Sequence, residues 1–231
     1  MNQSLGNRRV VVTGGFGILG RAVGDVLRSA GARVALIDKS AIPPDLPAGF
    51  SAQGGTDLGQ ESEAREAIDH VAIALEGLDA LVNVAGGFQW QTVEGGSIET
   101  WDRLYALNVR TAFLASQAAL PHLLASSHGR IVNVGAISAA SAVSGMGAYA
   151  AAKSGVARLT EAMAEEFKDR GITVNAVLPG ILDTPANRID MPKADATRWV
   201  DPAALAQVIG FLLSDLAAPI TGALIPVKGR L

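Results

Sequence analysis

Residues 9–20 read RVVVTGGFGILG, and this stretch decides the fold. It begins with β-branched residues typical of a strand and runs into a glycine cluster, after which residues 19–30 are predicted to form a helix. Glycines let the backbone turn tightly and approach a pyrophosphate closely, and the start of a helix offers free N–H groups. The stretch therefore predicts a dinucleotide-binding turn at Gly14, Gly17 and Gly20, although a purely structural turn would use the same residues.

Short apolar runs and longer helical stretches alternate along the rest of the chain. Further strands are predicted at 33–37, 81–84, 130–134, 173–177 and 223–227, with a weaker one at 50–53, and helices at 61–76, 98–126, 149–170 and 203–213. Strands buried on both faces read as continuous apolar runs, as several of these do. The alternation predicts an α/β fold: a single domain over residues 1–231 with a Rossmann-type, doubly wound parallel sheet and helices on both faces. Pro121 predicts a bend in the helix over 98–126.

Composition narrows the class of protein. The chain has 231 residues, no cysteine and a net charge of −3. Without cysteine, disulfide scaffolds and thiolate metal sites are excluded, and the three histidines lack ligand spacing, so we expect no metal. The acidic balance argues against nucleic acid as a partner, and no apolar run is long enough to span a membrane. Because no signal-peptide pattern is visible, the expected location is the cytoplasm.

Asp38 ends the second predicted strand, 24 residues after Gly14. A carboxylate at this place can accept hydrogen bonds from both hydroxyls of an adenosine ribose, and it repels a 2′-phosphate. It therefore favours NAD(H) over NADP(H). Lys39 leaves the alternative open, because a cation beside Asp38 could accommodate the phosphate.

Tyr149 and Lys153 lie four residues apart, which places them on one face of the helix predicted over 149–170. A phenol with its usual pKa of about 10 is a poor proton shuttle at neutral pH. An ammonium about 4 Å away could lower that pKa towards 7. The spacing therefore indicates a catalytic pair, although an exposed lysine beside a half-buried tyrosine would look the same.

Together these motifs resemble the short-chain dehydrogenase/reductase family across essentially the whole chain. The resemblance is carried by the glycine motif, Asp38, Asn83-Val84-Ala85-Gly86, Asn108, Tyr149 with Lys153, Pro179-Gly180 and Thr184-Pro185. It implies an oxidoreductase that moves a hydride between a nicotinamide cofactor and a small carbonyl or alcohol substrate. Tyr149 would exchange the proton with the substrate oxygen. In this family the helices corresponding to residues 106–124 and 150–166 form the subunit interface, so we expect a homodimer or homotetramer.

The resemblance also implies roles for single residues. Asn108 would hold a water that relays protons from Lys153, and Lys153 would bond the nicotinamide ribose and lower the pKa of Tyr149. The residues that the resemblance places around the cofactor are Gly14, Phe16, Gly17, Ile18, Gly20, Asp38, Asp57, Leu58, Asn83, Ala85, Gly86, Tyr149, Lys153, Pro179, Gly180, Ile181 and Thr184.

The sequence departs from the family pattern at two places. The glycine motif is TGxxGxxG rather than the commoner TGxxxGxG, and Ala136 stands where the family has a substrate-holding serine, 13 residues before Tyr149. Losing such a donor typically lowers the rate 10²–10³-fold where the donor is needed. Either Ser138 or Ser141 replaces the serine, or the substrate does not require it.

Three functions stay open. Ala136, residues 84–88 and residues 178–195 with Trp199 are similar to dihydropteridine reductase, a branch that works without the serine. A quinonoid dihydropteridine is therefore the alternative to an unspecified carbonyl or alcohol. A non-catalytic NAD-binding protein is the third possibility. We expect residues 181–200 to form a substrate lid. The candidate substrate residues are Ala136, Ser138, Phe88, Trp90, Met191 and Trp199.

Overall fold

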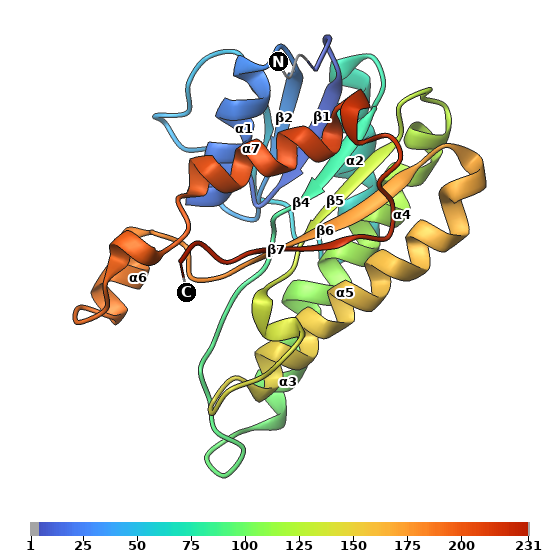
Figure 1. Ribbon diagram of the computed structural model, residues 1–231. Helices are drawn as coiled ribbons and strands as arrows, with labels where there is room; N and C mark the ends of the chain where they lie inside the picture. The colour runs from blue at the N-terminus through green and yellow to red at the C-terminus, as the bar shows by residue number, and fades with distance from the viewer. Residues whose placement is uncertain (1–4, 231) are drawn as a thin grey trace.

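The computed structural model describes residues 5–230, so residues 1–4 and 231 of the predicted domain lie outside it. Seven parallel strands form one sheet in the order β3-β2-β1-β4-β5-β6-β7 (Figure 1). The strands are β1 (Arg9–Thr13), β2 (Arg33–Ile37), β3 (Ser51–Gln53), β4 (Ala80–Asn83), β5 (Arg130–Val134), β6 (Thr173–Pro179) and β7 (Leu224–Val227). The predicted doubly wound parallel sheet is confirmed.

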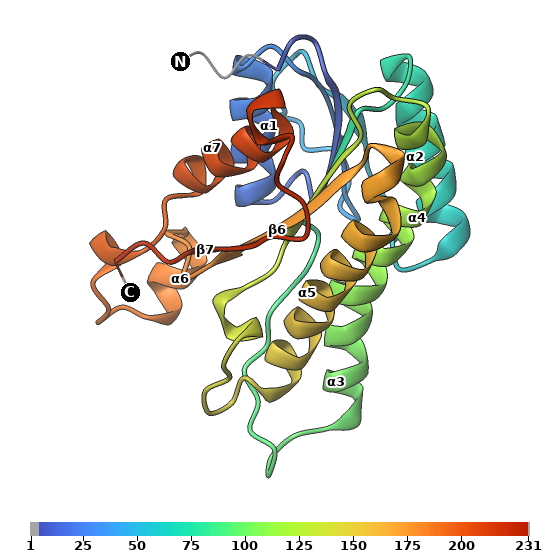
Figure 2. The ribbon, with the colours of Figure 1, turned by 45° about the vertical axis from the view of Figure 1, so that its right-hand side comes forward.

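Helices cover both faces of the sheet (Figures 1 and 2). One face carries α1 (Ile18–Ser29) and α7 (Pro202–Leu213), and the other carries α2 (Glu61–Leu75), α4 (Thr111–Leu124) and α5 (Gly147–Phe167). Successive strand residues point to opposite faces: Val10 and Val12 pack with α1 and α7, whereas Val11 packs with the other layer. Because both faces are buried, the central strands are largely apolar, with buried polar exceptions such as Asn133 in β5 and Asn175 in β6. No helix among residues 5–230 is both long enough and apolar enough to cross a membrane.

The stretch predicted as one helix over 98–126 is divided. It forms α3 (Ile98–Tyr105), a π-helical turn (Ala106–Arg110) and α4. The irregularity predicted at Pro121 was therefore misplaced, since Pro121 lies inside α4.

A further helix, α6 (Pro185–Asp190), interrupts the stretch predicted as a lid. Its start is set by Thr184, whose hydroxyl accepts a hydrogen bond from the N–H of Asn187 (3.2 Å).

The strand order reverses between β1 and β4, because the chain first adds β2 and β3 on one side of β1 and then β4 on the other. In open parallel sheets, ligands bind in the crevice that such a reversal creates beyond the carboxyl ends of the strands. The fold therefore directs attention to the residues that follow β1 and β4.

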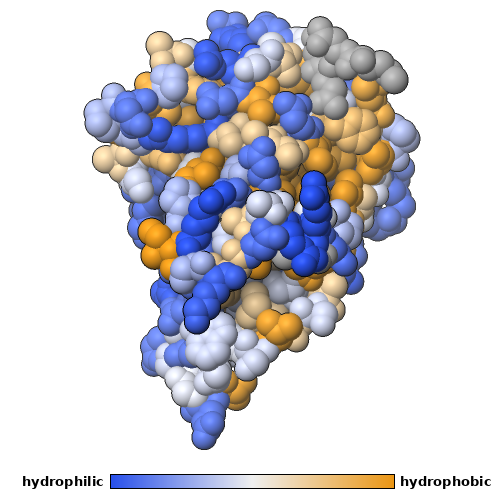
Figure 3. Space-filling model, turned by 60° about the vertical axis from the view of Figure 1, so that its left-hand side comes forward, coloured by the Kyte–Doolittle hydropathy of each residue, from blue (hydrophilic) through white to orange (hydrophobic). Residues whose placement is uncertain are grey.

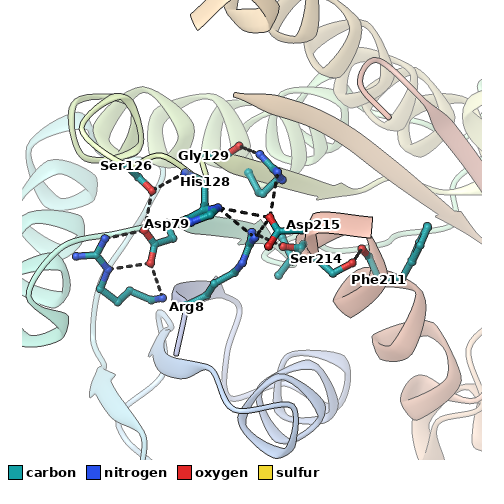
Figure 4. A network of polar contacts seen from close by, with 11 residues as sticks. Arg8, Asp79, Ser126, His128, Gly129, Phe211, Ser214 and Asp215 are labelled. Atoms are coloured by element: carbon teal, nitrogen blue, oxygen red, sulfur yellow. Dashed lines mark hydrogen bonds and ion pairs between the residues drawn. The ribbon is translucent and has the colours of Figure 1, made fainter. Parts of the chain in front are cut away.

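The opposite ends of the strands are joined by a polar network (Figure 4). Asp79 accepts hydrogen bonds from the backbone N–H (2.9 Å) and the guanidinium of Arg9 (2.6 and 2.8 Å), and from the Ser126 hydroxyl (2.6 Å). Beside it, Asp215 forms an ion pair with Arg8, and its Oδ1 lies 3.4 Å from His128 Nδ1. Burial acts to raise the pKa of Asp79, but the bonds from Arg9 and Ser126 outweigh it and hold the pKa far below its usual range.

We expect Asp79→Asn to lower the free energy of unfolding by about 2 kcal/mol at pH 7, because it removes charge-assisted hydrogen bonds. A lowered folded-state pKa gives stability that is present above the unfolded-state pKa of about 4 and is lost as the pH falls below it. Urea unfolding at several pH values should therefore show the two proteins converging in acid. Asp102→Asn, which changes an exposed carboxylate, is the control. A difference that persists unchanged at pH 2.5 would contradict the prediction.

Candidate active site

The loop after β1 and the segment after β4 meet at the switch point. Gly14 has a φ of +63°, and a Cβ on it would lie 2.8 Å from the Ala85 nitrogen. A Cβ on Gly20 would lie 2.1 Å from the Gly14 carbonyl oxygen. Thr13, which the sequence analysis missed, accepts a hydrogen bond from the Ala85 N–H through its hydroxyl (3.2 Å). Only glycine therefore fits at positions 14 and 20.

Asp38 lies against this loop. One carboxylate oxygen accepts a hydrogen bond from the Phe16 N–H (3.0 Å) and the other from the Ser40 N–H (2.9 Å). Lys39 forms an ion pair with Asp57 (2.8 Å), and this contact lowers the pKa of Asp57. The Lys39 ammonium, which follows Asp38 in the sequence, is thus paired with the Asp57 carboxylate. Gly17 precedes α1, which begins at Ile18, and Leu58 is buried beside the α2 layer.

Tyr149 and Lys153 lie in the first two turns of α5. Lys153 is buried, its Nζ donates a hydrogen bond to the Val134 carbonyl (2.8 Å), and it lies 5.9 Å from the centroid of the Tyr149 ring. Burial lowers the pKa of Lys153 to about 8 and raises the pKa of Tyr149 to about 12. Burial alone sets the direction of the Tyr149 pKa in this structure, so the lowering by Lys153 that the resemblance implies stays a prediction.

Asn108 lies in the π-helical turn, and both the nitrogen and the oxygen of its side-chain amide form hydrogen bonds with the backbone. Its Nδ2 donates to the carbonyls of Leu104 (2.9 Å) and Gly87 (3.0 Å), and its Oδ1 accepts from the Gly87 N–H (3.2 Å). A Cβ on Gly86 would lie 2.7 Å from Asn108 Oδ1 and 3.4 Å from Lys153 Nζ. Three residues that are far apart in the sequence (Gly86, Asn108 and Lys153) therefore converge.

Asn83 has a different environment. Its buried Nδ2 donates to Asn133 Oδ1 (2.9 Å) and Ser116 Oγ (3.0 Å), and Asn133 donates to Thr160 Oγ1 (2.9 Å). This network joins β4 and β5 to α4 and α5. The sequence analysis missed its other members, for which the visible signal was a polar residue inside an apolar strand, Asn133 in RIVNV.

One aromatic residue borders Tyr149, and a second follows that residue in the sequence. The Phe88 ring meets the Tyr149 ring edge to face, with centroids 5.0 Å apart. Phe88 and Trp90 are both more than half exposed, and Trp90 Nε1 donates to the Ser144 carbonyl (3.1 Å). Ala136 and Ser138, by contrast, are buried. Phe88 thus borders the tyrosine, whereas Trp90 lies against the loop at Ser144 and Gly145.

The segment after β6 leads away from the sheet and returns. The Gly180 N–H donates to the Val227 carbonyl (2.9 Å), and the Val200 N–H donates to the Ile181 carbonyl (2.8 Å). Thr184 caps α6, Met191 is half-buried, and Trp199 is buried. Trp199 therefore packs within the protein rather than presenting an open face. The side of the molecule that carries α6 is largely hydrophilic over its middle (Figure 3).

This geometry agrees with the comparison to known proteins. A family model described as short chain dehydrogenase matches residues 8–194. The chain belongs to the short-chain dehydrogenase/reductase family. The family predicted from the sequence is confirmed, and the chain is an NAD(P)-dependent oxidoreductase of that family.

Relatives of this short-chain dehydrogenase/reductase include both active and inactive proteins. It is 32% identical to 2-(S)-hydroxypropyl-CoM dehydrogenase 3 of Xanthobacter autotrophicus, over 99% of this chain and 98% of that protein. It is 36% identical to inactive 2-(S)-hydroxypropyl-CoM dehydrogenase 2 of the same bacterium, over 87% and 95% of the two chains. The structure of 3-ketoacyl-(acyl-carrier-protein) reductase from Brucella melitensis complexed with NADH matches with a TM-score of 0.87 and 26% identity, over 98% of this chain and 99% of that one.

Proposed function

We propose that this short-chain dehydrogenase/reductase interconverts a small carbonyl compound and its alcohol with NAD(H), and that Tyr149 exchanges the proton with the substrate oxygen. The observation that carries the proposal is the convergence of Gly86, Asn108 and Lys153 beside Tyr149. A merely structural helix would not need a buried lysine four residues after a tyrosine, since burying a charge is costly.

The residues present fit a dinucleotide. Glycine at positions 14 and 20 keeps side chains away from the turn after β1, and α1 begins within this stretch, at Ile18. Asp38, whose carboxylate accepts hydrogen bonds from two backbone N–H groups, would hold the adenosine ribose. When bound, the nicotinamide supplies or takes up the two electrons of the reaction as a hydride. The chain's own task is to orient substrate and cofactor and to move the proton.

The proposed proton transfer places a demand on Tyr149. Burial raises the pKa of the phenol to about 12, so the group is protonated at neutral pH but is a weaker acid than a free tyrosine. The proposal therefore requires the ammonium of the buried Lys153, which lies 5.9 Å from the centroid of the Tyr149 ring, to stabilise the phenolate that forms and so to lower the pKa of Tyr149 during the reaction. Asn108 positions the turn at Gly86 and Gly87 next to this pair.

The proposed cofactor preference predicts at least tenfold tighter binding of NADH than of NADPH. Asp38→Ala should reduce this ratio to below threefold, because it removes both the hydrogen bonds to the ribose and the repulsion of a 2′-phosphate. Titration of intrinsic fluorescence with each cofactor measures both ratios.

Lys39→Ala is the matched control, since Lys39 pairs with Asp57 and should leave the ratio nearly unchanged. A wild-type protein that prefers NADPH would contradict the prediction. It would then assign phosphate recognition to Lys39 or to Arg21, which pairs with Asp45 in this structure.

The proposed reaction is tested by incubating the protein with NADH and a panel of aldehydes, ketones and quinonoid dihydropteridines. We expect turnover of at least one carbonyl compound. If NADH binds and no compound on the panel is reduced, the proposed function is wrong.

Two specific observations favour a second candidate, the reduction of a quinonoid dihydropteridine. The buried alanine at position 136 leaves no hydroxyl there, and the exposed rings of Phe88 and Trp90 could cover a flat substrate. Preferential turnover of the dihydropteridine on the same panel would support this candidate. The inactive relative is a reason to test a non-catalytic role as well, and full function in Tyr149→Phe would support such a role.

We also propose that residues 181–200 act as a substrate lid within a single domain, and that the protein is a homodimer or homotetramer. The lid is supported by its attachment, since Leu182 pairs with Val200 and leaves α6 projecting between them. An oligomer is supported by the exposed Trp101 and Tyr105 on α3 and Phe113 on α4.

A further inference from the structure

A short 3-10 helix (Ile137–Ala139) follows Ala136 and packs on α5, the helix that carries Tyr149. The hydroxyl of Ser154, on α5, donates a hydrogen bond to the Ala139 carbonyl (2.7 Å). The 3-10 helix is therefore fixed to α5 one turn after Tyr149 and next to Lys153. Any polar side chain on it is held in a constant position relative to the proton donor.

Ser138, in the middle of this 3-10 helix, has an unusual hydroxyl. The residue is 8% exposed, and its Oγ is buried without a hydrogen-bond partner among residues 5–230. Buried hydroxyls are nearly always hydrogen-bonded, so an exception requires an explanation such as a functional role. The two other positions considered for a substrate-holding hydroxyl differ: Ala136 has none, and Ser141 is exposed to solvent.

We propose that the Ser138 hydroxyl donates a hydrogen bond to the substrate oxygen and so serves as the second donor beside Tyr149. This inference rests on the proposed function. As the carbonyl oxygen gains negative charge, Tyr149 transfers its proton to that oxygen, whereas Ser138 keeps its proton and stabilises the charge by hydrogen bonding. The missing serine at position 136 is thus replaced from two residues further along the chain, on a support that α5 holds rigidly.

The test is Ser138→Ala, assayed with NADH and the best carbonyl substrate of the panel. We expect kcat/KM to fall about 10²-fold, as for other donors of this kind, mainly through kcat. The Kd for NADH should stay within twofold of the wild-type value. The melting temperature should be equal or higher, because the substitution removes a buried hydroxyl that has no partner. Ser127→Ala, near the amino ends of the strands and so at the end of the sheet opposite the candidate site, is the matched control and should keep full activity.

A rescue experiment separates this role from a structural one. Ala136→Ser in the Ser138→Ala background should restore kcat/KM at least tenfold, whereas Ala136→Ser alone should change it less than threefold because a donor is already present. A packing defect at Ser138 would not be repaired by a hydroxyl at position 136.

Four results would overturn the inference: activity of Ser138→Ala within threefold of wild type, a lowered melting temperature that accounts for the loss, no rescue by Ala136→Ser, or a larger loss in Ser141→Ala. These results leave the proposed function intact, since the wild-type protein still turns over a carbonyl compound. If the wild-type protein reduces nothing on the panel, the proposed function and this inference both fall.

Discussion

Tyr149→Phe is expected to lower kcat at least 10²-fold and to leave the binding of NADH unchanged. The substitution removes only the hydroxyl that donates the proton, and positioned general acids typically contribute 10²–10⁴-fold to the rate. The ring stays, so the edge-to-face contact with Phe88 at 5.0 Å is retained and the first turn of α5 should not move. Steady-state kinetics with NADH, together with a fluorescence titration of the cofactor, separate the two effects.

Tyr105→Phe is the control for this substitution. Tyr105 is the only other tyrosine of the chain, it lies on α3, and it is 58% exposed. It should keep wild-type kcat. If Tyr149→Phe retains more than a tenth of the wild-type rate, another group donates the proton and the assignment of Tyr149 is wrong.

Gly20→Ala is expected to weaken the binding of NADH at least tenfold and to lower the melting temperature by about 5 °C. The added Cβ would lie 2.1 Å from the Gly14 carbonyl oxygen and 2.8 Å from the Gly15 Cα, so the loop must move. Overpacking of this kind costs about 1–3 kcal/mol, and each 1 kcal/mol lowers the melting temperature of a domain of this size by roughly 2–4 °C. Calorimetry and cofactor titration measure the two effects separately.

Gly210→Ala provides the same substitution at a helical position with room for it. A Cβ there would lie 3.6 Å from Leu27 Cδ2, which is ordinary contact, and the loss of a helical glycine usually stabilises. Its melting temperature should therefore be equal or higher, with unchanged cofactor binding. If Gly20→Ala behaves like Gly210→Ala, the close packing of the loop does not matter for the cofactor.

The sheet was predictable because its signals are local. The apolar run at 9–12 and the glycines after it identify β1 and its turn, and alternate burial of Val10, Val11 and Val12 explains why the run is continuous. The division of the stretch over 98–126 was not predictable in this way. The π-helical turn depends on Asn108 reaching the carbonyl of Leu104 and the backbone of Gly87, and the second contact is a tertiary one.

The sequence predicted which residues of the candidate site lie together better than it predicted their pKa values. Spacing predicted that Tyr149 and Lys153 share a face, but the pKa of each group depends on burial, which comes from helices and loops far away in the sequence. For the same reason the network of Asn83, Ser116, Asn133 and Thr160 was missed, since its members come from four separate elements.

The packing of α7 on α1 has a consequence for synthesis on the ribosome. The layer that covers Val10, Val12 and Val34 needs Leu205 and Ile209 of α7, which follow every strand except β7 in the sequence. A nascent chain that ends before residue 202 has all strands except β7 but leaves this apolar layer open to water. Exposed apolar surface of this kind makes incomplete chains prone to aggregation and attractive to chaperones. Synthesis of α7, rather than completion of β1 to β6, is therefore the step that allows this layer to close.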